Sequence, residues 1–179
     1  MIEVGTNCEF ALESLSPILF NKYLDEPQPK TPEGFREQGP RKCHRDEGDN
    51  ICITPDMISG TVREAMGDIA PKGKITVMRR DVMAGLFYKE ELFSLGVTEP
   101  DAIDARPVIR GKGAKTTLVI CYRPMLKKWL IQGTMNLIGL QPRLIKEALD
   151  WAGLKVGLGS FRPRFGRFRV TKWEVQEEN

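Results

Sequence analysis

Two segments that carry the signature of an amphipathic helix, each lying between strand-like segments, constrain the fold of this chain most. The first opens with Thr54-Pro55-Asp56, where threonine can cap a helix, proline suits the first helical position and aspartate suits the positive end. The second opens at Pro142. In both, the apolar residues recur at helical spacing; they are Ile58, Val62, Ala65 and Ile69 in the first, and Leu144, Ile145, Ala148, Leu149 and Ala152 in the second.

The ends of these helices and the neighbouring strands are also marked in the sequence. Pro71 and Gly73 follow the first stripe and disfavour its continuation. Gly153 follows the second, where we expect it to cap the helix in a left-handed conformation. Alternating apolar and polar residues predict the strands. We place them at residues 8–20, 74–80, 106–112, 116–123, 127–138 (bent or bulged at Gly133) and 165–176, with 82–95 open between strand and helix.

The order of these elements, β-α-β followed by a second β-α-β, predicts an α+β fold. It is the pattern of a ferredoxin-like (RRM-like) core, here with inserted β-hairpins, one of them formed by residues 106–112 and 116–123. A length of 179 residues suits a single domain over residues 1–179. Residues 24–50 contain four prolines, three glycines and almost no apolar residue, so we expect a long exposed loop or arm in the N-terminal half.

Several classes of protein are disfavoured. The chain has no apolar run of the roughly 20 residues that a membrane span requires, and its first residues lack the features of a signal peptide. We therefore expect a cytoplasmic protein with no membrane partner. Cys43, His44 and Cys52 could form part of a zinc site, but a fourth ligand is lacking and the spacing is irregular. No nucleotide-binding glycine motif is present. We expect no metal and no cofactor.

Positive charge gathers toward the C-terminal end. The formal net charge is +3, but from Cys121 onward 11 Lys/Arg stand against 5 Asp/Glu, which leaves the preceding residues with a net charge of −3. A chain polarised in this way favours an anionic polymer as its partner.

The densest basic and aromatic segment is residues 157–169. Glycine allows a backbone to approach a phosphate closely, arginine offers forked donors to phosphate oxygens, and an exposed phenylalanine can stack on a base. The candidate contacts are Gly157, Gly159, Phe161, Arg162, Arg164, Gly166, Arg167 and Arg169. If residues 165–169 are extended, Phe168 points away from Arg167 and Arg169, so at least one phenylalanine is expected in the core. Lys127, Lys128 and Arg143 are candidates to extend the basic path.

Two motifs resemble those of the RAMP superfamily, the ferredoxin-like RNA-binding proteins of CRISPR effector complexes. Gly157-Leu158-Gly159 with Gly166-Arg167-Phe168 resembles the C-terminal glycine-rich motif of that superfamily. The segment from Ile53 to Ala65 is similar to its first-helix signature. The resemblance implies binding of guide or repeat RNA, as by a backbone subunit, with Gly60 and Arg63 near the same surface as the glycine-rich loop. Both a CRISPR context and a stand-alone one are open.

We therefore expect binding of single-stranded nucleic acid, RNA in preference to DNA, largely without sequence specificity. Further subunits or further copies of this chain are the expected protein partners. The prediction of binding favours a protein that is not an enzyme. Two alternatives to it are open. One is a metal-independent endoribonuclease of RAMP type that uses His44 as its acid or base; an exposed loop histidine without such a role is the simpler expectation. The other is an assembly protein whose residues 24–50 dock on a neighbour.

Overall fold

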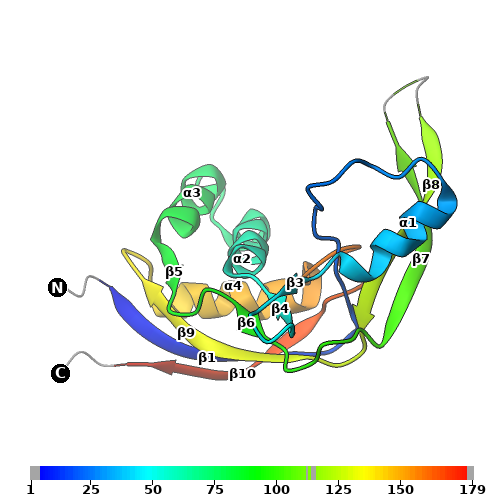
Figure 1. The fold of residues 1–179 in the computed structure, drawn as a ribbon. Helices are drawn as coiled ribbons and strands as arrows, with labels where there is room; N and C mark the ends of the chain where they lie inside the picture. The colour runs from blue at the N-terminus through cyan, green and yellow to red at the C-terminus, as the bar shows by residue number, and fades with distance from the viewer. Residues whose placement is uncertain (1–4, 112, 114–115, 177–179) are drawn as a thin grey trace.

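A four-stranded antiparallel sheet carries the main core of the molecule (Figure 1). The computed structural model describes residues 5–111, 113 and 116–176. The sheet has the order β10-β1-β9-β5. Its members are β1 (Thr6–Ser14), β5 (Leu86–Tyr88), β9 (Leu130–Leu137) and β10 (Phe168–Val175). The central strand β1 pairs with β9 on one side and with β10 on the other, so that Cys8 lies opposite both Met135 and Val175.

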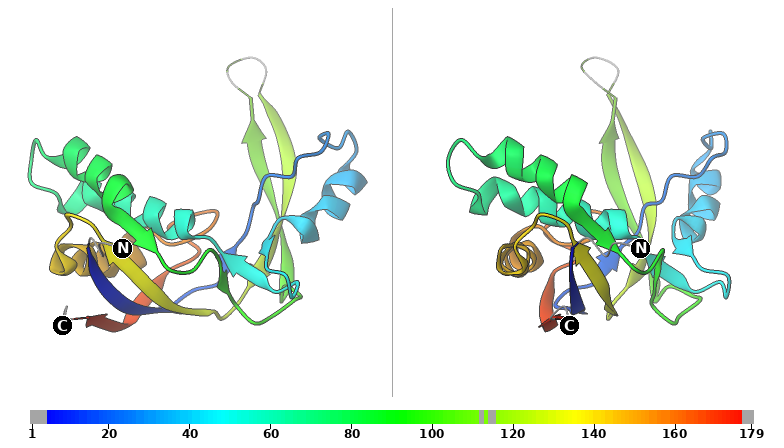
Figure 2. Two further views of the ribbon diagram at one scale, coloured as in Figure 1. Left: turned by 60° about the vertical axis from the view of Figure 1, so that its left-hand side comes forward. Right: turned by 90° about the vertical axis from the view of Figure 1, so that its left-hand side faces the viewer.

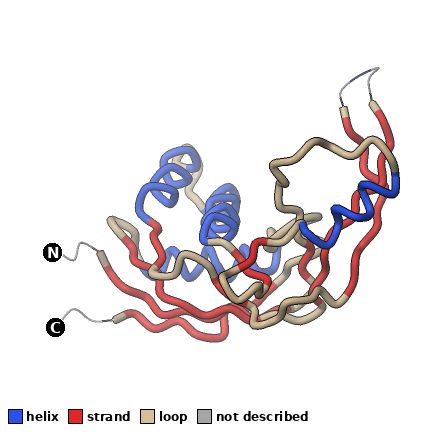
Figure 3. Tube along the Cα trace, in the orientation of Figure 1, coloured by secondary structure: helices blue, strands red, loops and turns tan. Residues whose placement is uncertain are grey.

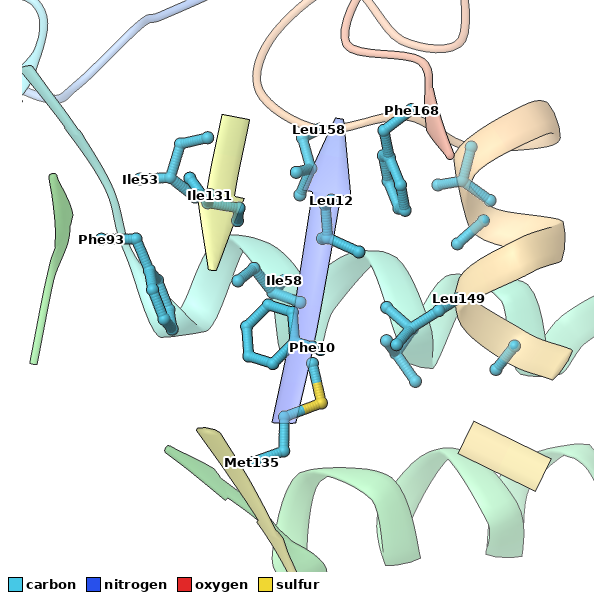
Figure 4. Close-up of a cluster of buried hydrophobic side chains, with 14 of the residues drawn as sticks. Phe10, Leu12, Ile53, Ile58, Phe93, Ile131, Met135, Leu149, Leu158 and Phe168 are labelled. Carbon is cyan, nitrogen blue, oxygen red and sulfur yellow. The ribbon is translucent and has the colours of Figure 1, made fainter. Parts of the chain in front are cut away.

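Three helices cover one face of this sheet, as the tube drawing makes plain (Figure 3). They are α2 (Pro55–Ile69), α3 (Ile75–Gly85) and α4 (Pro142–Lys155). Phe10 and Leu12 of β1 point toward the helices and pack with Ile58 of α2 and Leu149 of α4 (Figure 4). Glu9 and Glu13 alternate with them on the outer face, where they pair with Lys172 and Arg169. The sheet thus has one buried and one solvated face.

A long β-hairpin projects from one end of the molecule (Figure 2). The hairpin consists of β7 (Ala102–Arg110) and β8 (Thr117–Leu126), and β2 (Ile18–Leu19) extends it to three strands. Helix α1 (Pro32–Gln38) and the short 3-10 helix η1 (Gly39–Arg41) lie against β8. A third small sheet has the order β3-β4-β6 and links the two parts, with β3 (His44–Arg45), β4 (Ile51–Ile53) and β6 (Phe93–Ser94).

The helix signatures and the α+β class are confirmed. Thr54 caps α2, and its side chain accepts a hydrogen bond from the Met57 N–H at 3.3 Å. The apolar stripes of both helices are buried apart from the half-buried Leu144 and Ile69. The hairpin of β7 and β8 is confirmed as well, although part of the predicted turn, Lys112 and Ala114, lies outside the described residues. No described helix is long and apolar enough to cross a bilayer.

Residues 74–80 were predicted as a strand, and this prediction is wrong because Lys74 is the N-cap of α3 and residues 75–80 lie in this helix. The short alternation of Ile75 and Val77 gave the strand signal, but Val77 is exposed. The positions that face the core are the partly buried Met78 and the buried Val82 and Gly85, whose spacing of four and three residues is helical. The longer period, which lets α3 pack against α2, determines the structure.

Two glycines have other roles than those predicted. Gly153 lies inside α4 and does not have a positive φ; a Cβ atom there would collide with the carbonyl group of Phe168, so glycine allows α4 to pack directly on β10. Gly133 causes no bulge, because β9 keeps an unbroken register with β1. Its missing side chain makes room for the ring of Phe93 and the carboxylate of Glu90.

Residues 24–50 are not a featureless loop. They contain α1, η1 and β3, and Gln38, Gly39, Lys42 and Cys43 are buried. Gly39 packs against Tyr122 of β8, where a Cβ atom would be too close. The composition concealed these contacts because they are made by small, polar and amphipathic residues rather than by an apolar stripe.

The two helix glycines Gly153 and Gly60 provide a matched test of this packing. We expect Gly153→Ala to lower the free energy of unfolding by about 2 kcal/mol or more, since the added methyl group displaces β10 from α4. Gly60→Ala should instead raise it by up to about 1 kcal/mol, because Gly60 faces open space in a helix. Urea unfolding followed by circular dichroism measures both, and equal effects of the two substitutions would contradict the described packing.

Candidate nucleic-acid interface

The glycine-rich loop of residues 157–167 is held by hydrogen bonds from its own backbone. The N–H of Leu158 donates to the Gly166 carbonyl at 2.8 Å, and the N–H of Ser160 donates to the Leu19 carbonyl at 2.8 Å. Gly159 and Gly166 have φ values of +79° and +76°, and a Cβ atom at either would collide with a backbone carbonyl. Glycine is therefore required at both positions by close approach within the chain.

This arrangement changes the role expected for the glycines. Their close approaches are to the segment of residues 17–19 and to the opposite side of the loop, and several of the loop N–H groups are already donating. Contacts from this loop to an anion would therefore come mainly from its side chains.

The two motifs that lie about 100 residues apart in sequence meet in the structure. The hydroxyl group of Thr61 in α2 donates to the Gly157 carbonyl at 3.0 Å. Arg162 forms an ion pair with Glu64 of α2 at 3.1 Å. Gly60 and Arg63, the α2 residues expected near this surface, line a hollow of about 190 Å³ together with Glu64 and Arg79. The α2 motif and the glycine-rich loop thus form one continuous surface.

The four arginines of residues 157–169 are exposed but differ in their partners, and Arg169 lies on β10 rather than in the loop. Arg162 and Arg169 pair with carboxylates, Glu64 at 3.1 Å and Glu13 at 2.6 Å. The Nε–H of Arg167 donates to the Pro163 carbonyl at 2.9 Å, which leaves the outer part of its guanidinium group available to solvent. Arg164 is also exposed.

The three phenylalanines of the segment separate into core and surface. Phe168 is fully buried and packs edge-on against Trp129, with ring centroids 6.2 Å apart. Phe165 is 8% exposed, whereas Phe161 is 39% exposed. The alternation of Arg167, Phe168 and Arg169 across the strand is as predicted, and Phe161 is the ring of this segment that is accessible to a base.

The lysines predicted to extend the basic path lie near the loop, but Arg143 does not. Lys127 and Lys128 directly precede Trp129, whose backbone N–H donates to the Ser14 hydroxyl. The backbone N–H of Arg167 donates to the hydroxyl of Ser16, two residues further along the same segment. Both lysines are therefore close to the end of the loop. Arg143 lies on the first turn of α4, about 18 Å along the helix from the residues that enter the loop. It belongs to a separate surface.

His44 is half-buried rather than exposed, and it lies beside the glycine-rich loop. It lines a cavity of about 310 Å³ together with Gly159, Ser160 and Lys22, among others. Burial, and to a lesser degree the charge of Lys22, lowers the pKa of His44 below its ordinary value. The neutral imidazole is therefore the favoured form of His44 in the folded protein at neutral pH. Its place on β3 within folded structure could not be inferred from the sequence of residues 24–50.

Sequence reasoning missed two arginines that contact the loop from the hairpin. Arg106 of β7 and Arg123 of β8 both lie over the ring of Phe161, with the guanidinium carbon 5.3 Å and 5.2 Å from its centroid. Arg106 is also 4.6 Å from the ring centroid of Phe165. The one available signal was Arg123 itself, a charged residue inside the mostly apolar strand of residues 117–126.

A metal site is not evident among the described residues, where no group of three or more His, Cys, Asp and Glu side chains could hold an ion. Burial raises the pKa of Cys43, the neighbour of His44, to about 11.

No protein-family model matches the chain, and no curated protein matches it. Among solved structures, one chain of the cryo-EM structure of the Type III-B Cmr-beta bound to cognate target RNA is similar, with a TM-score of 0.58 and 11% sequence identity. The likeness is one of fold. The match covers 96% of this chain and 61% of that chain, so this chain spans less than two thirds of its structural neighbour.

The position of His44 generates a test by pH. Because its folded-state pKa is lowered, the unfolded chain binds more protons there, and stability is lost as the pH falls through the ordinary histidine pKa of about 6.5. We expect the unfolding free energy of the wild type to decrease more between pH 7.5 and 5 than that of His44→Gln. His44 is the single histidine, so the difference between the two urea curves isolates it. Parallel pH profiles would contradict its burial.

Proposed function

We propose that this chain binds single-stranded nucleic acid, RNA in preference to DNA, along the surface formed by residues 157–169 and the adjoining part of α2. The observation that carries the proposal is the grouping of three exposed arginines, Arg162, Arg164 and Arg167, on a loop whose backbone is rigidly held, with Arg169 following on β10. Such a loop keeps the guanidinium groups in a set arrangement, so little order must be imposed on them when a strand binds. Gly60 and Arg63 lie beside this surface, and Lys127 and Lys128 are near its other end.

Arginine–phosphate contacts would replace weak contacts within the protein. The pairs Arg162–Glu64 and Arg169–Glu13 are exposed, and exposed ion pairs contribute little to stability. A phosphate accepts two parallel hydrogen bonds from one guanidinium group and carries its own negative charge. Phe161 offers a stacking surface for one unpaired base. Contacts of these kinds carry little sequence information.

The sheet order supports the finer description of the fold that the sequence indicated. The sheet places the last of its four strands beside the first, then the third, then the second, with α2 following the first strand and α4 following the third. A ferredoxin-like core would have this arrangement. The two RAMP-like motifs come into contact at Thr61 and Gly157. We infer a RAMP-like subunit of a CRISPR-type ribonucleoprotein.

Further subunits or copies of this chain are the proposed protein partners. The protruding hairpin exposes Ile109, Leu118 and Ile120 to solvent, at 72%, 69% and 50% of their surface. Pairing in register places them on one face of the hairpin. Exposed apolar groups of this kind are typical of surfaces that contact another molecule.

The loop arginines can be tested against Arg36, an exposed arginine on α1. We expect Arg164→Ala and Arg167→Ala each to weaken binding of a labelled single-stranded RNA severalfold, as measured by fluorescence anisotropy. Four phosphate contacts predict a slope of log K against log salt of about −3 for the wild type, reduced by roughly 0.7 in each variant. Arg36→Ala should change neither value. A flat salt dependence, or equal losses in all three variants, would contradict the proposal.

A second function, metal-independent RNA cleavage, is favoured by one observation: His44 and Lys22 line the same cavity as Gly159 and Ser160 of the loop. A neutral imidazole can accept the proton of a ribose 2′-hydroxyl group, and a nearby ammonium group can stabilise the phosphate. Among the described residues, however, the chain brings no second histidine to act as the acid.

Incubation of end-labelled RNA with the protein in EDTA separates the two functions. We expect the wild type to leave the RNA uncut over several hours. Cleavage that disappears in His44→Ala and persists in Arg36→Ala would establish the endoribonuclease instead.

A further inference from the structure

Arg123 of β8 is a buried arginine with unsatisfied donors. The residue is 6% exposed, and neither its Nε nor its Nη1 atom has a hydrogen-bond partner among the described residues. Arginine retains its charge at any physiological pH, so the side chain cannot escape this situation by losing a proton. Buried charged donors without acceptors are strongly unfavourable. A fold that retains one therefore points to an acceptor that the protein alone does not supply.

The nearest carboxylate is already engaged. The register of β7 and β8 places Asp104 directly opposite Arg123, with Arg106 diagonal to it on the same face. Both carboxylate oxygens of Asp104 accept from the Nε–H of Arg106, at 2.8 Å and 2.7 Å. Asp104 thus neutralises Arg106 and leaves Arg123 without a carboxylate partner, so a net positive charge remains at the base of the hairpin.

Phe161 covers this charge. Its ring lies 5.2 Å from the guanidinium carbon of Arg123 and 5.3 Å from that of Arg106. The ring face attracts both cations, but it offers no lone pair to their N–H groups. Phe161 also has a φ of +61°, a conformation that is unfavourable for a residue with a side chain. Backbone strain and unsatisfied donors therefore coincide at one point, a combination typical of functional sites.

We propose that Arg123 and Arg106 form a receptor for one phosphate group, closed by Phe161 in the unliganded protein. The phosphate oxygens take the free N–H groups of Arg123, and Arg106 contributes the second cation. The ring of Phe161 moves aside to admit the ligand. The identification of the ligand as a phosphate of the bound strand rests on the proposed function; the anion site itself rests on Arg123.

The forked guanidinium group of Arg123 and the net positive charge of its surroundings favour a phosphate ligand over a carboxylate from a protein partner. A guanidinium group binds either planar pair of oxygens, but the site already contains a carboxylate, Asp104, that leaves Arg123 unsatisfied. Phe161, which covers the site, is followed in the loop by Arg162 and Arg164, two arginines of the surface proposed to follow a nucleic-acid backbone.

The variant Arg123→Met distinguishes a ligand-binding role of Arg123 from a purely structural one, because methionine keeps much of the side-chain volume and removes the charge. We expect this variant to be at least as stable as the wild type in urea, since replacing an unsatisfied buried ion by an apolar group is commonly neutral or favourable. We also expect it to bind single-stranded RNA about tenfold more weakly or worse, with a salt slope smaller by roughly 0.7. Arg123→Lys should keep the slope and lose part of the affinity. Arg36→Met is the matched control and should change none of these values.

Inorganic phosphate tests the site without RNA. At equal ionic strength, phosphate should raise the thermal midpoint of the wild type above that in chloride, and it should not do so for Arg123→Met. An equal rise in acetate would overturn phosphate in favour of a carboxylate ligand.

The outcomes separate the receptor from the proposed function. The receptor is overturned, and the proposed function stands, if wild type and Arg123→Met bind RNA equally or if phosphate has no effect on the thermal midpoint. A wild type that responds to phosphate through Arg123 but binds no RNA would overturn the proposed function alone. If Arg123→Met does not fold, Arg123→Lys and the phosphate response of the wild type decide the question.

Discussion

The close approach between the backbone of the glycine-rich loop and the segment of residues 15–19 holds the two halves of the structure together. The N–H of Gly166 donates to the Pro17 carbonyl at 2.7 Å, and the N–H of Leu15 donates to the Arg167 carbonyl at 2.7 Å. Leu19 accepts from Ser160 and also pairs with Met125 of β8. The loop is thus attached to the hairpin through β2 and to the main core through the buried side chain of Leu158. A side chain at position 159 would push the loop away from Ile18 and Leu19, and one at position 166 would force apart the two sides of the loop at Leu158, which explains glycine at both positions.

The same attachment explains why the basic residues form a surface. Arg162 reaches α2, Arg167 folds back on Pro163, and Phe161 reaches the hairpin, although all three belong to one short stretch of chain. The three side chains point in different directions because the loop backbone turns sharply between positions fixed by backbone hydrogen bonds. The positive charge of the C-terminal part is therefore displayed where three elements meet, instead of being spread over one strand.

Local features of the sequence predicted the elements well where local physics determines them. Thr54 and Pro55 begin a helix because capping and proline geometry act within one turn. The prediction for residues 74–80 was wrong because their short alternation was outweighed by packing of α3 on α2. Gly153 was assigned a local role, yet its reason is the carbonyl group of Phe168 on another element. The same limit applies to the site. The loop arginines were identified from composition. The burial of His44 beside Gly159 and of Arg123 beside Phe161 depends instead on contacts with a loop more than 35 residues away in sequence, which no local pattern encodes.

The central place of β1 has a consequence for how the chain acquires its fold. One neighbour of β1 begins at Leu130 and the other at Phe168, so Cys8 finds its partner Val175 across almost the whole chain. Contacts of such long range make folding slow, because the intervening chain must be ordered first. During synthesis, β1 leaves the ribosome long before β9 and longer still before β10. Until β9 is made, Phe10 and Leu12 lie on an unpaired strand with an apolar face, the kind of segment that associates with other chains. The demand on cellular folding assistance should therefore be greatest in the interval between the synthesis of β1 and that of β9.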